Sequence, residues 1–420
     1  MITEVFEKYE SEVRSYCRHF PTVFVKAKGP FMYDENNVSY IDFFCGAGSV
    51  NYGHNNDYIK PKLVEYLQSD GIIHALDMYT VPKREFIKSF QENILKARGL
   101  DYKIMFPGPT GTNGVEAALK LARKVKGRST VFALMSSFHG MTLGSLALTT
   151  DRDARKGAGV KLNDAVHIPI PTEFPELDTI KYMRYLIEDD HSGMEKPAAL
   201  VIETVQAEGG VNVFEISWLQ QVSKFCADND ILLIVDDIQV GCARTGTYFS
   251  FERAGIIPDI VILSKSIGGY GLPLALTLFK PELDIWNPGE HNGTFRGNQL
   301  AFIAAKAGIE YMLENNVEDQ AKKKGEIIKS YLENEIMPLD DRLKYRGIGM
   351  IWGVDFEAAG VDGFAVKVTD VAFEKGLILE CAGRRNSVVK LMPPLVIDEK
   401  TLLHGMSILK EAIVECLANI

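Results

Sequence analysis

The stretch Ile231-Leu-Leu-Ile-Val-Asp-Asp237, together with Asp259-Ile-Val-Ile-Leu-Ser-Lys265 further along the chain, decides the fold. Each is a short apolar run of the kind that forms a buried strand, and each ends on charged side chains. A lysine at the end of a buried strand is costly unless it reacts or is paired. The glycines in Ser266-Ile-Gly-Gly-Tyr-Gly271 let backbone come close to whatever the amine touches.

The side chains at these two strand ends are the pair that pyridoxal 5′-phosphate (PLP) chemistry requires. Lys265 would bind the aldehyde of the cofactor covalently. Asp236 would keep the pyridine nitrogen protonated, so that the ring withdraws electrons. The alternative is a salt-bridged structural lysine, and the rest of the chain has to decide between the two.

Apolar runs of the same kind alternate with helical segments between residues 104 and 280. We expect strands at residues 130–135, 198–203, 231–236, 260–263 and 274–279, and a helix at 217–229. Near-continuous Val, Ile and Leu runs separated by helices indicate a mainly parallel sheet covered on both faces. The sequence therefore predicts an α/β fold.

The two ends of the chain have a different pattern. A hairpin is expected over residues 23–42, and residues 345–420 read as α+β, with a closing helix at 400–417. We expect these parts to pack together into a smaller domain. The predicted division is residues 1–50 and 311–420 for the small domain and 51–310 for the large one.

Composition excludes several classes of protein. The chain has 420 residues, 46% of them apolar, and a net charge of −10, which argues against nucleic acid and anionic membranes as partners. No apolar stretch approaches the roughly 20 residues of a membrane span, and the N-terminus lacks a signal-peptide core. Six scattered cysteines suggest reduced thiols in the cytoplasm. No histidines pair at metal-ligand spacing, so no metal is predicted.

A candidate phosphate site precedes the helix expected over residues 115–125. Thr110, Gly111 and Thr112 offer hydroxyls and backbone N–H groups at a helix N-terminus, where anions bind. The loop lacks the Gly-Lys-Ser/Thr ending of a Walker loop and the glycine fingerprint of a dinucleotide site. A plain N-cap without a ligand is the alternative.

Further candidate residues follow other strands. Phe138 and His139 come just after the strand at 130–135, where an aromatic side chain can stack on a flat ring. Glu203 and Glu208 come just after the strand at 198–203. Open α/β sheets bind ligands at the carboxyl ends of their strands, so the joint occurrence of these signals favours one site over several unrelated structural features.

These residues resemble the class III PLP-dependent aminotransferases along nearly the whole chain. The matching blocks, in order, are Gly108-Pro-Thr-Gly-Thr-Asn-Gly-Val-Glu-Ala-Ala-Leu-Lys-Leu-Ala-Arg123, Phe138-His-Gly140, Glu203-Thr-Val-Gln-Ala-Glu-Gly-Gly210, Val235-Asp-Asp-Ile-Gln-Val-Gly-Cys-Ala-Arg-Thr-Gly246, Ser264-Lys-Ser266 and His291-Asn-Gly-Thr-Phe-Arg-Gly-Asn298. The resemblance implies fold type I: a large domain with a mainly parallel seven-stranded sheet, and a smaller α+β domain.

The resemblance also assigns roles to residues. The implied cofactor site comprises Thr110, Gly111 and Thr112 at the phosphate, Phe138 stacked on the ring, Asp236 at the pyridine nitrogen, Gln239 at the ring hydroxyl, Lys265 at the aldehyde, and the neighbouring His139 and Glu203. Lys265 and Asp236 would be the catalytic pair. Thr294 would reach the phosphate of the neighbouring subunit's cofactor, which implies a homodimer or higher homo-oligomer with shared active sites.

Within this family, the segments Phe106-Pro-Gly-Pro-Thr-Gly-Thr-Asn113 and Val389-Lys-Leu-Met-Pro-Pro-Leu395 are most similar to the L-2,4-diaminobutyrate–2-oxoglutarate aminotransferases of ectoine synthesis. That group transfers the amino group of L-glutamate to L-aspartate 4-semialdehyde. Lys390 and Met141 stand where many members of the family carry carboxylate-binding arginines. Lysine cannot form the bidentate fork of arginine. Arg384 and Arg385 could substitute, or could form an exposed basic turn.

Lys390 and Glu208 are therefore the candidate substrate-binding residues. Glu208 would either neutralise a basic residue at the gate or meet a substrate ammonium. Other readings remain open at this point: an ornithine- or 4-aminobutyrate-type ω-aminotransferase, an aminomutase or epimerase of the same fold, and a PLP-binding regulator without turnover. A regulator would be favoured by an attached DNA-binding module, which the sequence lacks.

Overall fold

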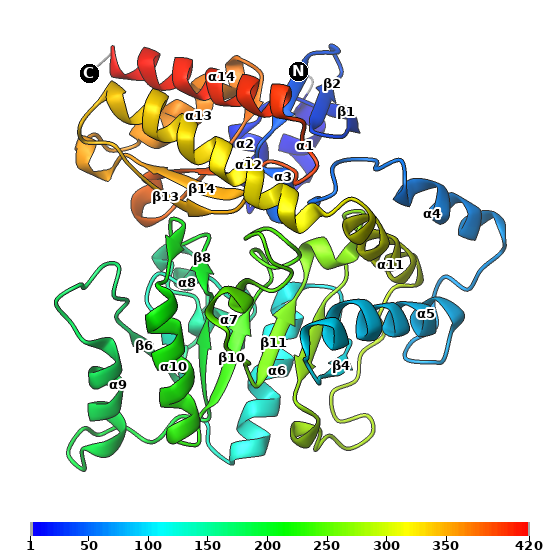
Figure 1. Ribbon diagram of the computed structural model, residues 1–420, viewed down its shortest axis with the longest axis vertical. Coiled ribbons are helices and arrows are strands. Elements are labelled where there is room, and N and C mark those ends of the chain that lie inside the picture. The colour runs from blue at the N-terminus through cyan, green and yellow to red at the C-terminus, as the bar shows by residue number, and fades with distance from the viewer. Residues whose placement is uncertain (1–2, 419–420) are drawn as a thin grey trace.

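The computed structural model describes residues 3–418 and contains a seven-stranded sheet (Figure 1). In hydrogen-bonded order its strands are β4 (Lys103–Met105), β12 (Leu276–Phe279), β11 (Ile260–Leu263), β10 (Leu232–Asp236), β7 (Ala199–Ile202), β5 (Val131–Leu134) and β6 (Ala165–Ile168). Strand β12 runs antiparallel to both of its neighbours, and all other pairings are parallel. The predicted mainly parallel, seven-stranded sheet is confirmed.

Helices cover both faces of this sheet (Figure 1). They include α5 (Val81–Phe90), α6 (Gly111–Lys126), α10 (Ile216–Asp228) and α11 (Gln299–Glu314). Alternate residues of each strand point to opposite faces, as the period of a strand requires. On β10, Ile234 packs in one core with Val115 of α6, and Val235 packs in another with Phe225 of α10. Burial on both faces explains why these strands read as unbroken apolar runs.

The two ends of the chain meet in the upper part of Figure 1. The antiparallel strands β1 (Phe24–Lys28), β2 (Phe31–Asp34) and β3 (Ser39–Asp42) continue into β15 (Leu377–Ile378), which pairs parallel with β3. A second antiparallel sheet has the order β13 (Lys344–Ile348), β14 (Ile351–Asp355), β17 (Val388–Leu391) and β16 (Glu380–Ala382). Helices α12 (Val317–Tyr331), α13 (Phe364–Glu374) and α14 (Glu399–Leu417) belong to the same part. The domain boundaries stay a prediction; α11 continues through residue 310.

Several elements differ from the sequence-based expectation. The helix after the phosphate loop begins at Gly111, not at Val115, because Thr110 caps it. Helix α5 ends at Phe90, and the chain continues from it as a π-helical turn at Gln91–Leu95. Further short elements are α1 (Glu4–Tyr9), α2 (Tyr16–His19), α3 (Cys45–Gly48), α4 (Ile59–Gln68), α7 (Leu143–Leu148), α8 (Arg152–Lys156), α9 (Thr179–Glu188), β8 (Val205–Gln206) and β9 (Asn212–Val213). Within residues 3–418, no helix has both the length and the apolar character needed to cross a membrane.

Candidate active site

A cavity of about 310 Å³ opens at the carboxyl ends of strands β5, β7, β10 and β11. This is the edge at which open α/β sheets bind ligands. The lining residues are Thr110, Gly111, Thr112, Phe138, His139, Gly140, Met141, Glu203, Glu208, Asp236, Ile238, Gln239, Val240 and Lys265. Most of the residues selected from the sequence therefore surround one cavity.

Lys265 projects into this cavity from the turn that follows β11. Its backbone φ is +52°, a left-handed conformation that costs a non-glycine residue about 1 to 3 kcal/mol. Burial lowers the pKa of its amine below the ordinary value, although Glu208 opposes this effect. A lowered pKa favours the neutral, nucleophilic amine.

The glycines after Lys265 have a different purpose from the one expected. A Cβ atom on Gly269 would lie 2.1 Å from the carbonyl oxygen of Ala304, so this glycine makes room for helix α11. A Cβ atom on Gly268 would meet nothing closer than 3.9 Å. The expectation that these glycines let backbone approach whatever the amine touches is thus corrected: Gly269 serves the packing of a helix against the lysine turn.

Asp236 at the end of β10 is held from behind by a histidine. His139 Nδ1 lies 2.7 Å from Asp236 Oδ2, and the backbone N–H of Ile238 donates to Oδ1 at 3.2 Å. The neighbouring Asp237 faces away from the cavity and accepts the N–H of Ser250 at 3.0 Å. Burial raises the pKa of Asp237 to about 7. The two adjacent carboxylates therefore have separate surroundings, and only Asp236 lines the cavity.

Glu203 is a second buried carboxyl group at this wall. Its Oε1 accepts the backbone N–H of Phe138 at 3.1 Å, which fixes the residue that was expected to stack on a ring. Burial raises the pKa of Glu203 to about 8, and the nearby Asp236 adds to the effect. Glu203 is consequently protonated near neutral pH and adds no charge beside Asp236.

The start of helix α6 forms the other wall. Among the described residues, no hydrogen bond engages the backbone N–H of Gly111 or of Thr112, so both donors are free for an anion. The Thr112 hydroxyl is within 2.8 Å of Ser145 Oγ. Gly140 has φ +126°, and a Cβ atom there would lie 2.5 Å from Thr112 Oγ1. Glycine at 140 therefore keeps the cradle open.

A buried ionic cluster lies at the side of the cavity that faces the small sheets. Lys390 Nζ donates to Glu208 Oε1 at 2.6 Å and lies 2.9 Å from Glu380 Oε2 and 3.4 Å from Gln239 Oε1. Burial would lower the pKa of Lys390, but Glu208 and Glu380 raise it far above its ordinary value. Of the two roles expected for Glu208, the structure shows the neutralisation of Lys390.

Two residues of this surrounding were not selected from the sequence. Glu380 pairs with Lys390 across neighbouring strands, as described above. The second is Tyr16 on α2, which lies near the same carboxylates. Burial raises the pKa of its phenol, and the charges of Glu380 and Glu208 raise it further. Neither stands in a distinctive motif. Only the pairing of β16 with β17 could have indicated Glu380.

Arg384 and Arg385 do not line the cavity. Arg384 pairs with Glu173, and Arg385 pairs with Glu357 at 3.0 Å on the surface. This arrangement does not support the suggestion that they replace carboxylate-binding arginines, because acidic side chains outside the cavity engage both charges. Met141 does line the cavity, as expected for its place after Gly140.

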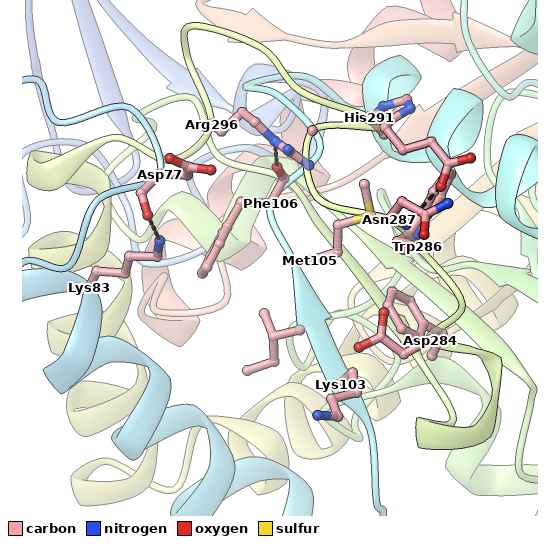
Figure 2. Close-up of a pocket in the computed structure, with 14 residues that line it drawn as sticks. Asp77, Lys83, Lys103, Met105, Phe106, Asp284, Trp286, Asn287, His291 and Arg296 are labelled. Atoms are coloured by element: carbon pink, nitrogen blue, oxygen red, sulfur yellow. Dashed lines mark hydrogen bonds between the residues drawn. The ribbon is translucent and has the colours of Figure 1, made fainter.

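Thr294 also lies outside the cavity of its own chain. Its loop borders a second cavity of about 270 Å³, lined in part by Asp284, Trp286 and His291 (Figure 2). Arg296 Nε donates to the carbonyl of Phe106 at 2.9 Å, which ties this loop to the segment that leads into the phosphate loop. Within one chain, Thr294 does not join the other predicted cofactor residues.

The groups around the first cavity fit PLP. A buried amine of lowered pKa, a carboxylate and two free N–H groups at a helix start correspond to the aldehyde, the pyridine nitrogen and the phosphate of this cofactor. Glu203, whose pKa is raised to about 8, adds no negative charge to that wall near neutral pH. The sheet, the cavity and this set of groups define a PLP-dependent enzyme of fold type I.

Comparison with known proteins gives the family. Residues 13–413 match the family model described as aminotransferase class-III, and the chain belongs to that family, whose cofactor is PLP. A relative from Halalkalibacterium halodurans named diaminobutyrate–2-oxoglutarate transaminase is 54% identical over 411 residues, which cover 97% of this chain and 96% of the relative. A protein of the same name from Streptomyces coelicolor is 52% identical over 419 residues, covering 98% and 97% of the two chains.

Solved structures share the fold at lower identity. An ornithine aminotransferase from Toxoplasma gondii matches with a TM-score of 0.86 at 24% identity, over 99% of this chain and 94% of that one. An acetylornithine aminotransferase from Elizabethkingia anophelis matches with a TM-score of 0.81 at 28% identity, over 98% of each chain. The resemblance to class III aminotransferases inferred from the sequence is confirmed.

Proposed function

We propose that this chain transfers the amino group of L-glutamate to L-aspartate 4-semialdehyde, giving L-2,4-diaminobutyrate and 2-oxoglutarate, as a step of ectoine synthesis. The observation that carries the proposal is the identity of more than half the residues, over nearly the whole length, with a relative named diaminobutyrate–2-oxoglutarate transaminase. The site supports it, because a cofactor pocket with a free amine adjoins a buried cluster of ionic side chains suited to a charged substrate.

When bound, PLP accepts electrons from the substrate carbon and stores the amino group between the two half-reactions. Lys265 Nζ is the group that accepts the proton leaving the substrate carbon and later returns it. Its lowered pKa suits this task, because a base works best when its pKa lies near the working pH. Asp236 holds the proton on the pyridine nitrogen, and His139 orients Asp236 through the 2.7 Å contact.

The remaining cofactor residues position the ring and the phosphate. Gly111 and Thr112 would donate their free N–H groups to the phosphate, with Thr110 beside them at the cap. Phe138 would stack on the ring, held by the buried Glu203. Gln239 would donate to the ring hydroxyl. Its amide donates to the carbonyl of Ala47 at 3.1 Å, and on cofactor binding it would either give up this hydrogen bond or donate to both acceptors.

Lys390 would bind a carboxylate of glutamate or 2-oxoglutarate. Its ammonium is engaged by Glu208, so a substrate carboxylate has to displace Glu208 from it. Lysine presents a point charge, which accepts carboxylates in more than one orientation. This property suits a site that receives two different substrates in turn.

We further propose a homodimer in which each subunit contributes Thr294 to the other's cofactor phosphate. An apolar patch supports this proposal; it comprises the exposed side chains Ile72, Ile73, Leu76, Met78, Tyr79, Val81 and Phe295. The patch reaches the Thr294 loop, since the His74 ring lies 3.1 Å from the carbonyl of Thr294 and 5.3 Å from the Phe295 ring. Contiguous exposed apolar surface is typical of an interface, and twofold symmetry would use the same loop reciprocally.

A cytoplasmic location is proposed as well. All six cysteines are unpaired, four of them buried, and such thiols suit a reducing compartment.

The function is tested by following the amino group. Purified enzyme with PLP is given ¹⁵N-labelled L-glutamate and L-aspartate 4-semialdehyde, and the products are identified by mass spectrometry. We expect ¹⁵N at the 4-position of diaminobutyrate and one equivalent of 2-oxoglutarate. An unlabelled diaminobutyrate pool, or transfer only to other aldehydes, would contradict the proposal. Formation of a rearranged product without any keto acid would point to the aminomutase alternative.

A further inference from the structure

The ionic cluster beside the cavity contains one cation and two carboxylates. Glu380 and Lys390 lie directly opposite each other on β16 and β17, so their side chains share one face of the sheet. Glu208 reaches the same ammonium from the loop between β8 and β9. The side chains are deeply placed: Lys390 is 1% exposed, Glu380 11% and Glu208 28%.

Lys390 neutralises one of these carboxylates and leaves the other without a full counter-charge. The contact to Glu208 is a directed hydrogen bond, whereas Glu380 Oε2 is near the ammonium but accepts no well-aligned hydrogen bond from any described residue. In accord with this, burial raises the pKa of Glu380. At Glu208, burial is outweighed by the charges of Lys390 and Lys265 together with hydrogen bonds from Lys390 and Gln239, so the pKa of Glu208 is lowered. A buried carboxylate with spare acceptor capacity is costly unless a ligand completes it.

The position of the cluster shows what such a ligand would be. Glu208 lines the cavity, and Glu380 Oε2 lies 2.9 Å from the same ammonium that donates to Glu208, so the cluster adjoins the cavity on the side of Glu208. An ω-amine that reacts at Lys265 has its other end directed away from the cofactor. If that end is an amino-acid head, it carries an ammonium group, which is the cation that the cluster lacks.

We propose that Glu380 binds the α-ammonium group of L-2,4-diaminobutyrate and of L-aspartate 4-semialdehyde, and so selects substrates that carry an amino-acid head. The inference rests on the proposed function, because it takes the head group from that reaction. It assigns the selection to a residue other than Glu208, whose charge is already matched by Lys390.

Specificity follows from the same charges. 4-Aminobutyrate has the same reactive amine and carboxylate as diaminobutyrate but lacks the α-ammonium. It would bring a third carboxylate to a cluster that already has an excess of negative charge, which disfavours its binding. Glutamate reacts through its α-amine and also presents a carboxylate without an ammonium at its far end, so Glu380 offers it no favourable contact either.

The test compares half-reactions of Glu380→Gln and the wild type in single-turnover absorbance experiments on the enzyme with PLP. Each amine is mixed separately: L-2,4-diaminobutyrate, 4-aminobutyrate and L-glutamate. We expect the specificity constant for diaminobutyrate to fall about 10- to 100-fold, the size of a lost charged hydrogen bond. The constants for 4-aminobutyrate and glutamate should stay within about threefold of the wild-type values or rise, because neither amine presents an ammonium group to Glu380.

Two further variants separate recognition from structure. Glu380→Asp keeps the charge and should recover part of the preference for diaminobutyrate. Glu335→Gln removes a surface carboxylate paired with Lys410 and should leave all three amines unaffected. An equal loss with every amine in Glu380→Gln, without rescue by Glu380→Asp, would mean that Glu380 only supports Lys390 and would overturn the inference.

Failure of the proposed function has a different signature. A wild type that does not react with diaminobutyrate would overturn the proposed function. The role of Glu380 would then be judged on ornithine and 5-aminovalerate, which differ by the same α-ammonium. An equal effect of Glu380→Gln on these two amines would overturn the inference by itself.

Discussion

His139 Nδ1 lies 2.7 Å from Asp236 Oδ2, and both side chains are buried at the back of the cofactor cavity. This contact to the imidazole holds the carboxylate in one orientation. Because Asp237 points the other way, toward Ser250, the structure separates two neighbouring aspartates that the sequence alone cannot distinguish.

Asp236→Asn should slow proton removal from glutamate. Asp236 is the proposed partner of the pyridine nitrogen, and its replacement by an amide would remove positioned electrostatic stabilisation. We therefore expect the rate of the glutamate half-reaction to fall about a hundredfold or more. Stopped-flow absorbance measures this rate. Asp237→Asn is the matched control and should stay within about threefold of the wild type, since that side chain touches no substrate. The reverse pattern would show that the wrong aspartate was assigned.

The His139–Asp236 contact also predicts a pH dependence of stability. Burial alone would lower the pKa of His139, but Asp236 raises it overall. When the pKa of a histidine is higher in the folded than in the unfolded protein, its protonation stabilises the fold. This stabilisation is complete at pH values below the unfolded-state pKa of about 6.5 and is lost as the pH rises through the folded-state pKa. The Tm difference between wild-type apoprotein and His139→Gln should therefore be widest near pH 6 and narrow at higher pH. A gap that grows with pH would contradict this coupling.

Lys265→Ala should fold and retain PLP without a covalent bond. Removing a buried amine relieves its desolvation cost, so the Tm of the variant apoprotein should be at least that of the wild type. Turnover should be almost abolished. Borohydride reduction followed by intact-mass analysis should add the cofactor to the wild type and leave the variant unmodified. Covalent labelling of Lys265→Ala after reduction would rule out Lys265 as the attachment point.

Shared active sites predict that inactive subunits complement each other. In a mixture of Lys265→Ala and Thr294→Ala dimers, a hybrid has one site with both defects and one with neither. Activity should therefore return after subunit exchange. Because one of its two sites is intact, each hybrid dimer should reach up to about half the activity of a wild-type dimer. Native mass spectrometry verifies the exchange. No recovery in a verified hybrid population would place Thr294 outside the partner's site.

Lys390→Met should lower stability and weaken glutamate binding. It leaves Glu208 and Glu380 buried together without their cation, and breaking such a pair costs about 3 to 5 kcal/mol. The KM for glutamate should rise more than kcat falls if the ammonium provides uniform binding. Denaturant unfolding and steady-state kinetics measure the two effects. Adding Glu380→Gln should recover part of the stability, and a Lys390→Met variant as stable as the wild type would contradict the buried-cluster account.

Much of the large sheet was predictable from the sequence. Strands such as β10 and β11 are buried on both faces, so their sequences are continuous apolar runs, which surface elements do not have. Strands β4, β13 and β16 were missed because they are short or carry charged residues, and α13 was missed although much of it is buried. A short, partly charged strand is specified by its partners more than by its own composition.

The candidate site divides in the same way. Lys265, Asp236 and the phosphate loop follow strand ends or begin a helix, and local sequence therefore marks them. Glu380 has no such mark: it is a single carboxylate in a short strand, where a solvent-facing side chain is the ordinary expectation. Its importance depends on its register opposite Lys390, a contact between strands that the sequence does not specify locally.

The central claim is that the chain is an aminotransferase specific for diaminobutyrate, and the ratio of specificity constants tests it most directly. The enzyme with PLP is assayed with 2-oxoglutarate and, separately, diaminobutyrate, ornithine or 4-aminobutyrate. One methylene in an apolar pocket is worth about 10- to 200-fold, so ornithine should be worse than diaminobutyrate by about that factor. We expect 4-aminobutyrate, which lacks the α-ammonium, to be used less well than diaminobutyrate. A higher specificity constant for ornithine or 4-aminobutyrate would contradict the assignment, although the chain would still belong to the aminotransferase family.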